Sequence, residues 1–186
     1  MDKIHLDLRG TNSNIFFTSD LHFGHHNIIS FCRRPFSDCK EMRSGLIEMW
    51  NSVVSKEDYV FQLGDFYWFD SSRGLVSILS NLNGSIFHIL GNHDMAKAWR
   101  NISVLSSIVH LSVSDDIGFH RFVLSHYPLL TWQGRERGVF NLHGHIHRCK
   151  GASRTNPDFQ LEYSEYHYDV GVDNNFLKPV SYKNFL

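Results

Sequence analysis

Short clusters of histidine, aspartate and asparagine recur along the chain, and each cluster follows an apolar run. The 186-residue chain contains 13 histidines, whose scatter excludes an appended tag. Carboxylate and imidazole ligands suit Zn, Fe, Mn or Ni, so the clusters point to a metal site. The candidate ligands that share this placement are Asp20, His22, Asp65, Asn92, His126, His145 and His147.

Seven candidate ligands exceed the quota of a single tetrahedral or octahedral ion, which favours two ions. An aspartate can bridge two ions through its two oxygens. Two divalent ions carry a charge of +4, from which the carboxylates of Asp20 and Asp65 and a bridging hydroxide subtract 3. The net charge of about +1 attracts a phosphate. Such ions also lower the pKa of water and so supply a nucleophile near neutral pH. The residues therefore predict a two-ion centre for phosphate chemistry.

The elements that must position these clusters alternate between strands and helices in the first half, and are mostly strands in the second. In α/β folds, ligands bind outside the carboxyl ends of strands, so separate segments can converge on one site. We predict a single α/β domain over residues 1–186. Strands are expected at 14–19, 59–63, 85–90, 108–113, 117–125, 139–142 and 159–172, and helices at 27–34, 38–54 and 72–82.

Five motifs in a fixed order carry a family resemblance. They are DLH (Asp20–His22), GD (Gly64–Asp65), GNHD (Gly91–Asp94), HYP (His126–Pro128) and GHIH (Gly144–His147). Together they resemble the calcineurin-like metallophosphoesterases over most of the chain, and DLHFGHHNII with the later RPF and GVD resembles a small bacterial and phage branch. The resemblance implies a four-layer α-β-β-α sandwich with the site at one edge.

The resemblance also implies a role for each ligand. Asp20, His22 and His147 would hold one ion together with a bridging Asp65. Asn92, His126 and His145 would join Asp65 around the second ion. His93 matches the catalytic histidine, which binds the phosphoryl oxygen or protonates the leaving alkoxide. We expect two divalent ions, Mn²⁺ first, with Fe, Zn and Ni as alternatives.

Four further residues are candidates for roles beside the ligands. His25 either reaches the substrate or supports a ligand, or is a plain loop histidine, and Asp94 either orients His93 or caps the next helix. Arg34 either contacts a substrate phosphate or is a solvated helix end. Asp173 is expected to support a ligand histidine from behind.

The second motif departs from that of the protein phosphatases. Where they carry GDxxDRG, this chain reads GDFYWFDSS, with Trp68 in place of the second acidic residue. Protein phosphatase activity is therefore not expected, and the aromatic run of residues 66–69 could instead wall the pocket. The chain also lacks the capping domains of some nucleotidases and nucleases of the superfamily.

Composition excludes several classes of function. The formal charge is −1 without a basic cluster, so no duplex nucleic-acid face is evident. Three cysteines without CxxC spacing argue against a disulfide framework and a thiolate zinc site. The polar N-terminus and the lack of a long apolar run predict a cytoplasmic protein without a membrane span.

These observations predict a metal-dependent phosphoesterase. The first expectation is hydrolysis of phosphodiester or phosphomonoester bonds of small molecules or nucleotides. A nuclease or nucleic-acid end phosphatase is the alternative, which stacking aromatics near the site would favour. A non-catalytic scaffold is the third, and it is disfavoured because such members typically lose ligands that this chain keeps. The sequence makes no prediction of oligomeric state.

Overall fold

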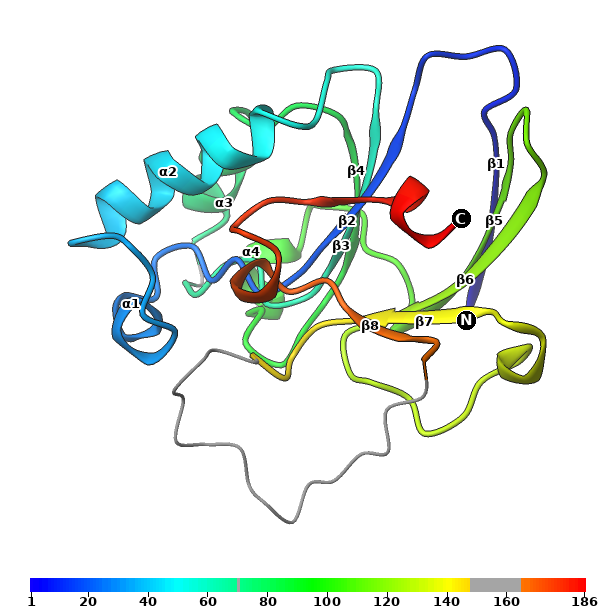
Figure 1. The fold of residues 1–186 in the computed structure, drawn as a ribbon. Helices are drawn as coiled ribbons and strands as arrows, with labels where there is room; N and C mark the ends of the chain where they lie inside the picture. The colour runs from blue at the N-terminus through cyan, green and yellow to red at the C-terminus, as the bar shows by residue number, and fades with distance from the viewer. Residues whose placement is uncertain (70, 148–164) are drawn as a thin grey trace.

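Two β-sheets face each other in the fold (Figure 1). The computed structural model describes residues 1–69, 71–147 and 165–186. The five-stranded sheet has the order β1-β5-β6-β7-β8 and the four-stranded sheet the order β4-β3-β2-β9. The strands are β1 Asp2–Asp7, β2 Ile15–Thr18, β3 Tyr59–Leu63, β4 Ser85–Ile89, β5 Ile108–Ser114, β6 Phe119–Ser125, β7 Phe140–His143, β8 His167–Asp169 and β9 Val180–Ser181.

Parallel pairing brings strand ends to a common edge in both sheets. β2, β3 and β4 run parallel, with Phe17 opposite Phe61 and Phe61 opposite Phe87. β6, β7 and β8 are also parallel to one another. An isolated bridge between Ser19 and Gly171 links the chain just beyond β2 to the segment that follows β8. The segments after these strands are therefore held close together.

The space between the sheets is filled by apolar side chains. Phe17 and Phe61 point inward from the four-stranded sheet and are fully buried, and Leu111 and Leu124 meet them from the five-stranded sheet. β5 shows the alternation of buried and half-buried residues expected of a strand with one face in the core. This core fixes the register of the strands and hence the positions of their ends.

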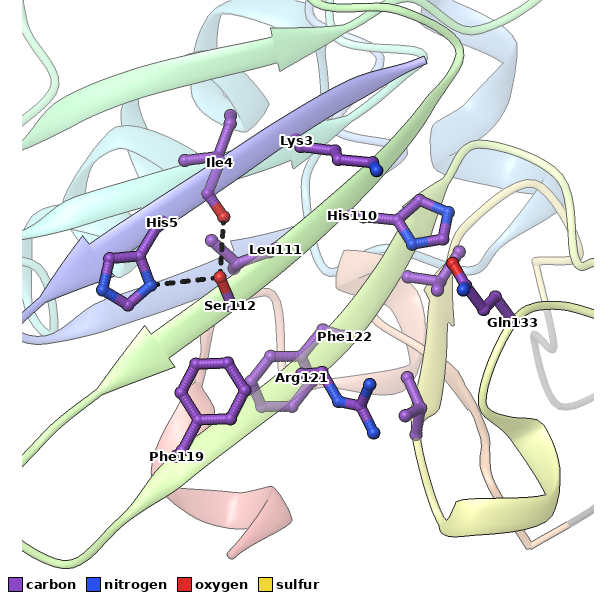
Figure 2. A pocket seen from close by; sticks show the side chains of 12 residues that line it. Lys3, Ile4, His5, His110, Leu111, Ser112, Phe119, Arg121, Phe122 and Gln133 are labelled. Carbon is purple, nitrogen blue, oxygen red and sulfur yellow. Dashed lines mark hydrogen bonds between the residues drawn. The ribbon is translucent and has the colours of Figure 1, made fainter.

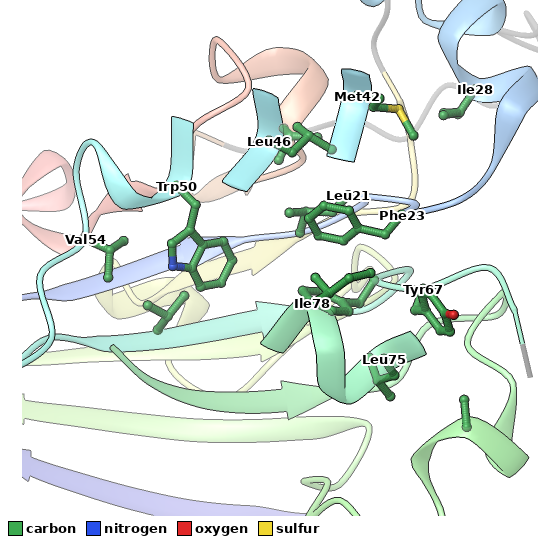
Figure 3. Close-up of a cluster of buried hydrophobic side chains, with 14 of the residues drawn as sticks. Leu21, Phe23, Ile28, Met42, Leu46, Trp50, Val54, Tyr67, Leu75 and Ile78 are labelled. Carbon is green, nitrogen blue, oxygen red and sulfur yellow. The ribbon is translucent and has the colours of Figure 1, made fainter. Parts of the chain in front are cut away.

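The α-helices cover the other face of the four-stranded sheet (Figures 1 and 3). In α2, Met42, Leu46 and Trp50 repeat at helical spacing and form one buried face. The Trp50 indole N–H donates to the Asn83 carbonyl at 3.0 Å, so the polar atom of this large side chain is satisfied. The helices are α1 His26–Phe31, α2 Cys39–Asn51, α3 Ser72–Leu79 and α4 Ala96–Trp99.

The outer face of the five-stranded sheet has a different cover. A small cluster of Val123, Trp132 and Val139 packs there under the loop that contains the 3-10 helix Arg135–Arg137. Within the described residues this loop, not an α-helix, forms the fourth layer. Beside it Lys3 and Arg121 project over an open hollow of about 280 Å³ (Figure 2).

The expected α/β class and two-sheet sandwich are confirmed, and most boundaries agree within a few residues. β1, β9 and the 3-10 helices were not predicted, and α3 ends at Leu79, three residues early. Residues 159–164 of the last predicted strand lie outside the described residues, and β8 begins at His167. None of the helices in the described ranges has both the length and the apolar character needed to cross a bilayer.

Candidate metal centre

The predicted ligands lie just beyond the strand ends in an unusual backbone conformation. Asp20, His22, Asp65, His145 and His147 all have φ between 45° and 74°. Eight non-glycine residues of the described chain have positive φ, and five of them are these candidate ligands. Such left-handed residues cost conformational energy and cluster at functional sites. The fold therefore holds these side chains in orientations that an ordinary loop would not adopt.

The first ligand group contains Asp20, His22 and His147, whose ligand atoms lie within 4.8 Å of one another. The two Nε2 atoms of His22 and His147 are 3.1 Å apart, and Asp20 Oδ1 lies 3.6 Å from His147 Nε2. His147 Nδ1 faces the Asp173 carboxylate at 3.0 Å, so a neutral His147 ring has its proton there and its lone pair on Nε2. Asp20 Oδ1 is buried without a hydrogen-bond partner among the described residues. A cation would satisfy these facing acceptors.

The second group contains Asp65, His126 and His145, with Asn92 beside it. His126 Nδ1 lies 2.8 Å from the Leu63 carbonyl oxygen and must donate to it, so a neutral ring has its lone pair on Nε2. That nitrogen is 3.0 Å from Asn92 Oδ1, so the neutral ring and the amide oxygen present two acceptors to the same point. The donor set thus fits an ion here as well.

Asp65 stands between the two groups. Its Oδ2 atom lies 3.6 Å from His22 Nε2, in the first group, and 3.6 Å from His126 Nε2, in the second. Its Oδ1 atom accepts a hydrogen bond from the His93 backbone N–H at 2.8 Å. The carboxylate is almost completely buried, so its charge faces the imidazoles and not solvent.

Burial sets the protonation of these groups. It lowers the pKa of His22 far below its usual value, helped by the nearby His147 and Arg34 charges. Burial also lowers the pKa of His145 to about 4. Both rings are therefore neutral at pH 7 and offer lone pairs. Burial raises the pKa of Asp20, which indicates a carboxylate that lacks enough positive charge around it.

Glycines allow the ligand loops to approach each other. A Cβ atom on Gly91 would collide with the backbone N and Oδ1 of Asp65, and one on Gly144 would collide with Asp20 Oδ2. Gly64 has φ of 101° and borders the His126 ring. The glycines in the GD, GNHD and GHIH motifs are thus explained by contact between backbone and ligand.

Asp94 joins two of the ligand loops. Its Oδ1 atom accepts from the backbone N–H groups of Phe66 and Tyr67, at 3.0 and 3.1 Å, and its Oδ2 atom from that of Gly91, at 2.9 Å. Neither expected role is seen, because α4 begins after Met95 and Asp94 does not bond the His93 ring. It fixes the loop after β4 against the loop that carries Asp65.

Arg34 is buried behind the first ligand group, contrary to both expectations for it. Its guanidinium forms a bidentate ion pair with Asp173, at 2.7 and 2.9 Å. The same group donates to the carbonyl oxygens of Asp20 and Leu21, each at 2.7 Å. The other partner of Asp173 is His147, whose Nδ1 lies 3.0 Å from its carboxylate. Arg34 thus fastens the ligand loops and does not face a substrate.

His93 differs from the candidate ligands by being accessible, with 43% of its side chain exposed. Its ring lies beside Trp68 and His22, at centroid distances of 4.9 and 5.5 Å. Of the aromatic run, Phe66 and Tyr67 are buried and so do not wall the pocket, whereas Trp68 does border the site. Across the site the centroid of the Tyr127 ring lies 4.4 Å from that of the His145 ring.

The cysteines depart from expectation in one respect. Cys39 has a free thiol, whereas Cys32 is disulfide-bonded. Spacing did not exclude a disulfide, because pairing depends on proximity in the fold. Cys32, His147 and Asp173 form a third group dense enough for an ion. However, Cys32 offers no thiolate and Arg34 already occupies Asp173, so this group is a poor ligand set.

The hollow on the outer face of the five-stranded sheet is unrelated to these ligands. Its lining includes His5, His110 and Arg121 but no carboxylate (Figure 2). It therefore lacks the donor set that a hard or borderline cation requires.

Comparisons with known proteins show the family of this chain. A profile of the family described as calcineurin-like phosphoesterase matches residues 13–181. An uncharacterized protein of Methanocaldococcus jannaschii is 36% identical over 134 residues, covering 72% of this chain and 69% of that protein. The gene 66 protein of Mycobacterium phage D29 is 33% identical over 171 residues, covering 78% of this chain and 84% of the phage protein.

A solved structure shares the fold. It is a protein of unknown function from Aquifex aeolicus, with a TM-score of 0.64 and 23% identity, covering 93% of this chain and 97% of that one. The profile extends over the strands and loops that carry every candidate ligand. The chain belongs to the calcineurin-like phosphoesterase family.

Proposed function

We propose that this protein is a phosphoesterase whose active site holds two divalent metal ions that share Asp65. The position of Asp65 carries the proposal, because one carboxylate oxygen lies 3.6 Å from a histidine nitrogen of each ligand group. Asp20, His22 and His147 would hold the first ion with Asp65. His126, His145 and Asn92 would hold the second with the same carboxylate. We expect Mn²⁺ as the preferred ion.

Such ions supply positive charge for a phosphoryl group and lower the pKa of water. The chain itself contributes a neutral, lone-pair-bearing His22 and His145 and the accessible ring of His93. The His93 backbone is anchored on Asp65, so its ring is held at the edge of the ligand cluster. In that position it can hydrogen-bond a phosphoryl oxygen or give a proton to the leaving alkoxide.

The substrates we expect are small phosphodiesters or phosphomonoesters. A nuclease or nucleic-acid end phosphatase is the second candidate, and the half-buried Trp68 beside His93 favours it because aromatic rings stack on unpaired bases.

Hydrolysis of bis-(p-nitrophenyl) phosphate by the purified protein loaded with Mn²⁺ tests this function. We expect turnover that EDTA abolishes, and a loss of about 10²- to 10⁴-fold in His93→Gln. His110→Gln is the matched control, because His110 lies on the outer face of the five-stranded sheet. Absence of turnover of this diester, and of p-nitrophenyl phosphate, with every one of Mn²⁺, Mg²⁺, Zn²⁺, Fe²⁺ and Ni²⁺ would contradict the proposal.

A further inference from the structure

We propose that the stacked rings of His25 and Trp68 form a binding site for an unpaired nucleobase, which makes the substrate a nucleotide or a single-stranded nucleic acid. This inference rests on the proposed function and specifies its substrate class.

The two rings stack face to face, so each covers one face of the other and only their remaining surface is open to a ligand. Their centroids are 3.7 Å apart and their planes differ by only 4°, which is a parallel stack. Both side chains are half-buried, so part of the stack is accessible. Phe31 meets the His25 ring edge-on at 6.4 Å and is 51% exposed, so the aromatic surface continues outward.

This surface adjoins the reacting position. The Trp68 ring centroid is 4.9 Å from that of His93, the ring proposed to contact the phosphoryl group or the leaving alkoxide. The leaving alcohol of a substrate whose phosphoester lies at His93 would therefore be adjacent to the Trp68 ring. In a nucleoside 5′-phosphate that alcohol is a nucleoside, whose base can lie against the aromatic surface.

Backbone hydrogen bonds hold the two loops together, and the rings stack on each other without a ligand. Trp68 N–H donates to the Phe23 carbonyl at 3.1 Å, and His25 N–H donates to the His22 carbonyl at 3.0 Å. A bridge between Phe23 and Tyr67 ties the two loops together. A preformed surface loses little conformational entropy on binding, so most of the stacking free energy contributes to the binding affinity.

A flat ring surface distinguishes between classes of phosphoester. Stacking of one base on an aromatic side chain contributes about 1–3 kcal/mol whichever base is used, which corresponds to roughly 5- to 150-fold in affinity. An aliphatic phosphoester such as a sugar phosphate gains nothing comparable. The preferred ligand is therefore one that carries both a phosphoester and a nucleobase.

Adenosine 5′-monophosphate and ribose 5-phosphate make a matched pair, because they share the 5′-ester and differ in the base. Their binding can be titrated on the Mn²⁺-loaded protein carrying His93→Gln, by calorimetry and by tryptophan fluorescence. Trp68 is the reporter, because Trp50, Trp99 and Trp132 are buried. A short single-stranded oligonucleotide, alone and annealed to its complement, forms the second arm and separates a free nucleotide from a strand.

We expect adenosine 5′-monophosphate to bind more tightly than ribose 5-phosphate and to quench the fluorescence. Trp68→Ala should weaken nucleotide binding roughly 5- to 150-fold and leave ribose 5-phosphate binding unchanged. Trp68→Phe should retain most of the affinity, because it keeps a ring. Phe69→Ala is the matched control, because Phe69 packs over Gly24 and is 50% exposed.

Equal binding of the two phosphates, or unchanged nucleotide binding in Trp68→Ala, would overturn the inference. An oligonucleotide that binds only as a single strand supports it, and one that binds equally well as a duplex counts against it. The inference and the proposed function can fail separately. If the protein hydrolyses bis-(p-nitrophenyl) phosphate but shows no preference for a ligand with a base, only this inference is refuted. Nucleotide binding without any turnover removes the proposed function and leaves a nucleotide-binding site at these rings.

Discussion

Arg34 offers the sharpest test of how the fold supports the ligand cluster. Its guanidinium is the cationic partner of Asp173 and also binds the Asp20 and Leu21 carbonyls. Arg34→Met keeps a long apolar side chain but removes every one of these hydrogen bonds. The Asp173 carboxylate, which is only 4% exposed, then remains buried without its cation.

The expected cost follows from the burial of the pair. Removing one partner of a buried ion pair costs about 3–5 kcal/mol, because the other charge stays buried and unpaired. Asp173 also orients His147, so its displacement should weaken metal binding by roughly 10- to 100-fold.

Urea unfolding in EDTA measures the first effect and Mn²⁺ titration of the folded protein measures the second. Arg33→Met is the matched control, because the neighbouring Arg33 is exposed. The double variant Arg34→Met with Asp173→Leu should recover much of the lost stability, since it removes both charges. If Arg34→Met unfolds within about 0.5 kcal/mol of Arg33→Met, the reasoning is wrong, because surface substitutions commonly stay within that range.

Three further predictions concern other parts of the fold. Burial lowers the pKa of His88 to about 3, below its usual value of 6.5, so the unfolded chain binds a proton that the folded chain does not between these pH values. Stability should fall as pH drops from 6.5 toward 3 by about 1.4 kcal/mol per unit, and His88→Leu should remove that share in urea titrations at several pH values. Gly91→Ala should cost about 1–3 kcal/mol and weaken Mn²⁺ binding, because its Cβ would displace Asp65; wild-type affinity in calorimetry would refute this. Asp38 accepts from the N–H groups of Lys40 and Glu41, both at 2.8 Å, so Asp38→Ala should lower the unfolding free energy by about 1 kcal/mol, and an unchanged melting temperature would count against the cap.

The sequence predicted best the elements whose signal is local. Strand 59–63 matches β3 residue for residue, because an apolar run ended by glycine marks a buried strand. The predicted helix at 38–54 corresponds to α2, which spans Cys39–Asn51, because its apolar residues repeat at helical spacing. β1 was missed because it is an edge strand of mixed polar and apolar residues, and only its pairing with β5 defines it.

In the candidate site, too, the sequence predicted the features that have a local signal and missed those that depend on tertiary contacts. The ligand types and their placement after strands could be read locally, and the structure gathers all seven in one cluster. The roles of Arg34 and Asp94 could not be predicted from the local sequence, because both residues bind backbone groups that are distant in sequence. The His25–Trp68 stack likewise joins loops that follow different strands.

The central claim is that one carboxylate, Asp65, is shared by two metal ions. Metal analysis after equilibrium dialysis against Mn²⁺ and removal of free ions measures the number of ions per chain directly. We predict two ions in the wild type, one in His126→Ala, and a loss of both in Asp65→Ala. A single ion in the wild type, or two ions retained by Asp65→Ala, would contradict the account.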